Sequence, residues 1–170
     1  MIKRLSRTIC ISLCSLLFAI NLSAQSSDSK FSLGGDFGLQ FGTITLINIS
    51  PKLGYRATEK FTFGPGLVYQ YFRDNRYGIS TSVYGASAFG RYTIFENVAA
   101  YSEFQQLYYS ITAEGQSLSR EVPILFVGGQ YFSNLGGNFN LSISILFDIL
   151  ENENSPYQNP YIGLGGAYLF

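Results

Sequence analysis

Hydrophobic and polar side chains alternate along residues 138–150. The odd-numbered positions carry large apolar residues, namely Phe139, Leu141, Ile143, Ile145, Phe147 and Ile149. From Asn138 to Asp148, the even-numbered positions carry Asn, Ser and Asp, with Leu146 as the exception. A period of two predicts a β-strand with two unlike faces. Taken alone, the pattern leaves open whether the apolar face contacts a protein core or lipid.

The same alternating unit recurs from Phe31 onward, and no helical periodicity is visible. We expect eight strands, at residues 31–42, 44–57, 61–72, 81–94, 98–111, 121–132, 138–150 and 160–170. Short connections (58–60, 95–97, 133–137) alternate with longer polar ones (73–80, 112–120, 151–159), although the first connection, near residues 42–43, is also short. Membrane strands need ~9–11 residues, whereas soluble strands average about five or six. The pattern predicts an all-β, eight-stranded, antiparallel, up-and-down transmembrane β-barrel over residues 31–170.

The composition of the two faces favours lipid on the outside. The apolar face of the well-patterned segments carries no charge near its middle, and the opposite face is rich in Gly, Ser, Asn and Gln. A charge on a lipid face costs about 2–4 kcal/mol at mid-depth. Only 13% of the chain is charged, against about a quarter in soluble domains. Two segments, 83–94 and 121–132, have apolar residues on both faces and remain ambiguous.

Charged residues within the strands are expected to pair inside the barrel. If the first hairpin turns near Ile44, Asp36 lies directly opposite Lys52, and Arg91 can meet Glu103 in the same way. Such interior ion pairs would fix the strand register. The interior of an eight-stranded barrel is only wide enough for side chains. We expect it to hold the polar residues Gln40, Asn48, Gln70, Gln105 and Asn140, with Asp148 near the outer mouth.

The first 24 residues read as a cleaved signal peptide. Lys3, Arg4 and Arg7 precede an apolar run from 8 to 20, and 22–24 is a small-residue cleavage site. The run is shorter than a spanning helix needs. A lipoprotein signal is the alternative, because Cys10 and Cys14 lie here, but neither follows a small residue. Residues 25–30 are expected to be disordered, and the mature chain would contain no cysteine.

The residue types that most enzymes depend on are scarce. The chain has no His, which removes the usual general base and the commonest metal ligand. Glu114, Glu121, Glu151 and Glu153 could form a loose carboxylate pair, but they read better as solvated loop charges. Eleven basic and eleven acidic residues cancel, which gives no footprint of nucleic-acid binding. We therefore expect no enzyme activity, no cofactor, no metal and no nucleic-acid partner.

The leader, the eight segments and the ending YIGLGGAYLF together resemble the small outer-membrane barrels of the OmpA and OmpX type, and in style the outer-membrane β-barrel proteins of Bacteroidetes. The ending is similar to the signal read by the barrel assembly machinery, which implies a recognition role for Phe170, Tyr168, Leu164 and Ile162. Gly166 departs from the alternation. The resemblance implies a monomer in the outer membrane of a Gram-negative bacterium, in contact with lipid and, during biogenesis, with the assembly machinery. The short outer loops argue against a large protruding sheet, and no peptidoglycan-binding domain is expected after Phe170.

Three functions from different classes are open at this stage. The first is a structural or surface-contact barrel, the second a narrow channel or small-ligand transporter, and the third a soluble, lipocalin-like binding barrel in the periplasm. Fold analogy does not choose among them.

Overall fold

The computed structural model describes residues 30–40, 44–74, 79–113 and 116–170. The expected signal peptide (1–24), most of the segment after it (25–29), the first turn near 42–43 and Glu114 lie outside these ranges. In the described part, no helix is long and apolar enough to span a membrane.

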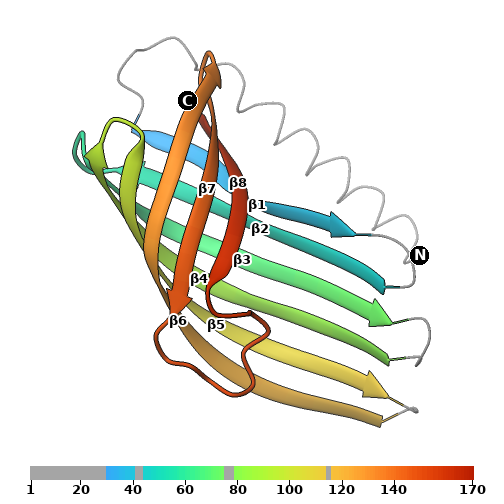
Figure 1. Cartoon of the computed structure of the whole chain (residues 1–170). Helices are drawn as coiled ribbons and strands as arrows, with labels where there is room; N and C mark the ends of the chain where they lie inside the picture. The colour runs from blue at the N-terminus through green and yellow to red at the C-terminus, as the bar shows by residue number, and fades with distance from the viewer. Residues whose placement is uncertain (1–29, 41–43, 75–78, 114–115) are drawn as a thin grey trace, which may run out of the picture.

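Eight antiparallel strands close into one barrel in chain order (Figure 1). Each strand pairs with its sequence neighbours, and β1 pairs with β8. The strands are β1 Phe31–Gln40, β2 Ile44–Arg56, β3 Phe61–Asp74, β4 Ile79–Phe95, β5 Val98–Ala113, β6 Gln116–Gly136, β7 Phe139–Asp148 and β8 Tyr161–Leu169. The predicted all-β fold, strand number and strand order are confirmed.

Period-two alternation sets the two faces of β7. Every odd-numbered residue from Phe139 to Phe147 is at least 40% exposed, whereas Ser144, Leu146 and Asp148 are at most 5% exposed. The apolar side chains therefore point away from the barrel interior, and Leu146 is an apolar residue on the inner face. A soluble barrel would place these faces the other way round.

The two ends of the barrel differ. The tight turns after β2, β4 and β6 lie at one end, together with Phe31 and Phe170, and the connection from 149 to 160 lies at the other (Figure 1). We refer to these as the turn end and the loop end. At the turn end, Gly136 and Gly137 adopt φ values of 120° and 58°, which favour glycine.

Two of the predicted long loops are in fact paired strands. Arg73 pairs with Ser80 in the β3–β4 hairpin, and Ala113 pairs with Gln116 in the β5–β6 hairpin. As a result β6 has 21 residues, whereas β7 has 10. The strands from β2 to β6 extend at the loop end well past the start of β8 (Figure 1). The expectation of loops over 73–80 and 112–120 is wrong for the described residues, because these polar stretches continue the backbone ladder.

Two prolines interrupt the ladder between β2 and β3. Pairing stops between Ile49 and Lys52, where Pro51 lies, and again between Lys52 and Tyr55, opposite Pro65. Proline has no N–H to donate to a neighbouring strand. Pro51 and Pro65 are both exposed, and their missing donors weaken the β2–β3 pairing.

Candidate functional site

Lys52 is the centre of a charged cluster inside the barrel. Its Nζ lies 2.7 Å from Asp36 Oδ2 on β1 and 2.7 Å from Glu103 Oε2 on β5. It also lies 3.0 Å from the hydroxyl of Tyr101, which in turn donates to Glu103 Oε2 at 2.7 Å. The Glu103 side chain is only 2% exposed. One ammonium group therefore joins three strands that are not all neighbours.

The register differs from the one expected. Asp36 opposes Ser50, and Lys52 opposes Gly34, so the β1–β2 register is shifted by two residues from the expected one. The structure still brings Asp36 and Lys52 together, but they form a diagonal pair, because Lys52 lies two residues beyond the residue directly opposite Asp36. A long lysine side chain spans such a diagonal.

The expected pairing of Arg91 with Glu103 is wrong. Arg91 opposes Tyr101, and Glu103 opposes Phe89, so the β4–β5 register differs by two residues from the one expected. Glu103 instead binds Lys52, and the Arg91 guanidinium lies 5.4 Å from the centre of the Phe132 ring. The interior charges thus form a three-residue cluster with Arg91 apart from it.

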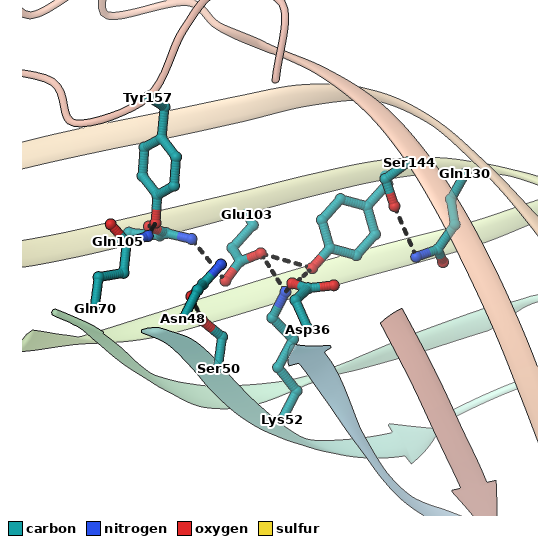
Figure 2. A network of polar contacts seen from close by, with 11 residues as sticks. Asp36, Asn48, Ser50, Lys52, Gln70, Glu103, Gln105, Gln130, Ser144 and Tyr157 are labelled. Atoms are coloured by element: carbon teal, nitrogen blue, oxygen red, sulfur yellow. Dashed lines mark hydrogen bonds and ion pairs between the residues drawn. The ribbon is translucent and has the colours of Figure 1, made fainter. Parts of the chain in front are cut away.

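A chain of neutral polar groups continues from the charged cluster toward the loop end (Figure 2). Gln105 Nε2 donates to Glu103 Oε1 at 3.1 Å, and the Tyr157 hydroxyl donates to Gln105 Oε1 at 2.9 Å. Gln70 Nε2 donates to the same hydroxyl at 2.8 Å. Tyr157 lies in the connection between β7 and β8, so this loop is hydrogen-bonded to the barrel interior.

The loop also packs against an apolar cluster that the sequence pattern did not reveal. The ring of Tyr157 lies 4.9 Å from that of Phe126 and 5.0 Å from that of Tyr161. Phe126 belongs to a buried group formed with Val68, Val83, Leu107, Val122, Ile124 and Leu146. Several of these residues come from the two segments whose faces were ambiguous, because their inner and outer positions are both apolar. Burial raises the pKa of the Tyr157 hydroxyl well above its usual value, so it remains protonated and able to donate.

The other residues expected in the interior lie at different heights along the barrel axis. Asn48 accepts a hydrogen bond from Ser50, and Asn140 accepts one from Asn134 near the turn end. Asp148 is 5% exposed, and its Oδ1 accepts from the backbone N–H of Leu150. Gln40 lies on β1, but its side chain is outside the described part. Gln130, which donates to Ser144 at 3.1 Å, was not foreseen.

Aromatic side chains form two rows on the outer surface. Tyr69, Tyr84 and Tyr108 stand on successive strands near the loop end, and the last two stack with ring centres 5.8 Å apart. Phe31, Tyr55 and Phe63 form a similar row near the turn end, at 5.3 and 5.8 Å. On β3, Phe63 and Tyr69 are six residues apart, which is about 20 Å along a strand. Of the outward-facing side chains described between the rows, none is charged.

The residues expected to serve in assembly line the outer face of the last strand. Ile162, Leu164 and Tyr168 are exposed there. The Phe170 ring lies 5.4 Å from that of Tyr168, and its N–H donates to the carbonyl of Phe31 at 3.1 Å. Phe170 therefore lies where the first and last strands meet.

The described residues contain no group of three or more His, Cys, Asp or Glu side chains that could hold a metal. The chemistry that the interior offers is hydrogen bonding and ion pairing that fills the barrel. Many of its polar groups bond to one another, and a hollow of about 50 Å³ lies beside Lys52 and Arg91. Five buried polar atoms have no partner among the described residues, namely Ser87 Oγ, Arg91 Nε, Tyr109 Oη, Gln130 Oε1 and Asp148 Oδ2.

Comparison with known proteins gives a fold and no family. No family model matches the chain, and no curated protein matches it. The N-terminal β-barrel domain of Pseudomonas aeruginosa OprF is similar in structure, with a TM-score of 0.51 and 15% identity over 84% of this chain and 98% of that domain. Ail, the attachment invasion locus protein of Yersinia pestis, aligns with a TM-score of 0.45 and 16% identity over 83% of this chain and 93% of that one. The likeness to OprF supports the small eight-stranded barrel fold.

Proposed function

We propose that this chain is an integral outer-membrane β-barrel with a filled interior and a structural or surface-contact role rather than an enzymatic one. The observation that carries the proposal is the uncharged apolar band between the two aromatic rows. Membrane barrels have such a band, about 25 Å tall and flanked by aromatic girdles. In water, the same band would be a very large exposed apolar surface.

The soluble alternative is disfavoured by the direction of the side chains. A lipocalin-like barrel holds its ligand in an apolar interior and shows charge to water. Here Ile143, Ile145 and Leu164 are at least half exposed, whereas Lys52 and Glu103 are interior. This arrangement suits a protein that has lipid outside.

The channel alternative is opposed by the contents of the interior. Tyr157 closes the loop end through its bonds to Gln70 and Gln105, and Lys52 crosses the middle between Asp36 and Glu103. We expect a closed trace in a planar bilayer.

Fractionation tests the proposal directly. The full chain, expressed in a Gram-negative host, should stay in the membrane after carbonate washing and should migrate faster on a gel before boiling than after it. Release by carbonate, or mobility that does not respond to heat, would contradict the proposal. Stepwise single-channel currents through the wild-type barrel would favour the channel instead.

A further inference from the structure

The seam that closes the barrel is incomplete. β1 and β8 pair over only five positions, from Ser32–Leu169 to Asp36–Gly165. The same register would place Phe37 opposite Leu164, yet pairing has stopped, while β1 continues beside β2 and β8 beside β7. Toward the loop end the two strands diverge (Figure 1). Each therefore has an unpaired edge on the side that faces the other.

An apolar groove follows the outer face of this seam. It has a volume of about 500 Å³ and is bounded by Phe37, Ile49 and Leu164, among others. Gly35 and Gly166 lie in its lining, and glycine leaves the backbone uncovered there. Asp36 also reaches the groove, but its carboxylate already binds Lys52. The groove thus offers a hydrocarbon surface and no free charge.

A second hollow lies beside the start of β8, along the part of that strand that does not pair with β1. Its volume is about 380 Å³, and its lining joins Ile162, which faces outward on β8, to the interior residues Asn48 and Gln70. Tyr157, Tyr161 and Gln158 complete its polar side. All of these polar groups are neutral hydrogen-bonding groups. On β8, Ile162 is two residues from Leu164, so the hollow and the apolar groove lie along the same edge.

We propose that this opening is a lateral binding site for a single-chain amphiphile with an uncharged, hydrogen-bonding head group, such as a monoacylglycerol. The acyl chain lies in the groove beside Phe37 and Leu164, and the head group enters between Asn48 and Gln70. Unpaired backbone groups at a strand edge are costly against hydrocarbon, so a head group that hydrogen-bonds to this edge stabilises the barrel. Among the described residues, the lining contains no charged group except Asp36, which is paired with Lys52, and this selects against ionic head groups. The inference rests on the membrane placement proposed above.

Disulfide trapping tests whether the seam is open. Both natural cysteines lie in the first 24 residues, so a pair can be placed in the barrel alone. Leu33→Cys with Tyr168→Cys is the control, because these residues are paired across the same seam. Phe37→Cys with Leu164→Cys is the equivalent pair four residues further along. A disulfide needs Cα atoms about 4.4–6.8 Å apart, so we expect near-complete oxidation of the control and little of the second pair. Equal oxidation would overturn the proposal.

Fluorescence quenching tests the occupant. The chain has no Trp, so Phe37→Trp reports on the groove and Phe104→Trp on the far side; both positions face outward. Each variant is reconstituted in phosphatidylcholine vesicles with a small mole fraction of brominated monoacylglycerol. We expect quenching at position 37 to exceed that at position 104 at least threefold, and unbrominated monoacylglycerol to reverse it. Equal quenching at the two positions would overturn the proposal.

Two controls separate the possible failures. Brominated phosphatidylcholine as the bulk lipid should quench Phe104→Trp; if it does not, the membrane placement fails and the site fails with it. If brominated phosphatidylcholine quenches Phe104→Trp but brominated monoacylglycerol quenches Phe37→Trp no more than Phe104→Trp, the binding site is contradicted and the membrane placement stands. Dimers formed by single Phe37→Cys under oxidation would assign the open edge to a second copy of the chain and would overturn the proposal.

Discussion

At the scale of residues, the interior is organised by one cation shared between two carboxylates. Lys52 contacts Asp36 and Glu103, which stand on strands far apart in the sequence, and Tyr101 bonds to both Lys52 and Glu103. A buried ion pair stabilises little compared with an apolar replacement, but removing one member leaves the others uncompensated. We therefore propose that the cluster favours one register over its neighbours.

Replacing Lys52 tests this role. Lys52→Met leaves two carboxylates without a cation and should lower the free energy of unfolding by about 3–5 kcal/mol. The triple variant that adds Asp36→Asn and Glu103→Gln removes the uncompensated charges and should recover most of the loss. Urea unfolding in lipid vesicles measures both. An unchanged stability of Lys52→Met would show that the cluster carries no such role.

Tyr157 connects the last loop to the interior, and its hydroxyl is protonated at neutral pH. Because burial raises its folded-state pKa above the ordinary value near 10, its contribution is complete below about pH 10 and is lost as the pH rises through the raised pKa. Tyr157→Phe loses two hydrogen bonds but keeps the ring packing, whereas Tyr157→Ala loses both.

We expect Tyr157→Ala to open the loop end and to give measurable conductance at pH 7 in planar bilayers. Tyr157→Phe should remain closed at pH 7, with stability reduced by ~1–3 kcal/mol. Equal, closed traces for wild type and Tyr157→Ala up to pH 10 would mean that the loop does not close the barrel.

At the scale of elements, alternation predicted the strands well and their ends poorly. β7 spans 139–148, close to the expected 138–150, because large apolar and small polar residues alternate cleanly there. β6 begins at Gln116 rather than near 121, because the polar residues of that stretch read as a loop while their backbone pairs with β5. Arg91 was misassigned because alternation fixes the face on which a residue lies, and a shift of two residues along the neighbouring strand keeps that face.

Arginine substitutions on β7 test which solvent its outer face meets. Ile143 lies mid-strand and Phe139 at the turn end, and both face outward. In a bilayer, Ile143→Arg should cost about 2–4 kcal/mol and Phe139→Arg about 0–1 kcal/mol. Unfolding titrations in vesicles compare the two. Equal costs at both positions would argue against a depth-dependent, lipid-like environment.

The last strand holds the residues that the sequence predicts to form an assembly signal. Phe170 packs on Tyr168 and bonds to Phe31, so it contributes to closure as well as to any recognition. Deleting Phe170 should lower the amount of heat-modifiable barrel in the outer membrane several-fold, and Phe170→Tyr, which keeps an aromatic ring, should not. Wild-type amounts of the deletion variant would remove Phe170 from the assembly signal.

At the scale of the whole molecule, the barrel is closed firmly on one side and loosely on the other. Strands from β2 to β6 pair over long ladders, whereas β1 and β8 share five pairs. The alternation and the two unlike faces predicted the fold class, strand number and topology. These patterns could not predict the short β1–β8 seam, the apolar interior around Phe126 or the insertion of Tyr157, because each depends on contacts between segments far apart in the sequence.

The central claim is that the apolar face of each strand meets lipid. A nitroxide scan from Asn138 to Leu150 in vesicles, one cysteine at a time, tests it most directly. The claim predicts that oxygen accessibility oscillates with a period of two and peaks at Phe139, Leu141, Ile143, Ile145 and Phe147, where a water-soluble relaxation agent is excluded. High accessibility of these odd-numbered positions to the water-soluble agent would contradict it.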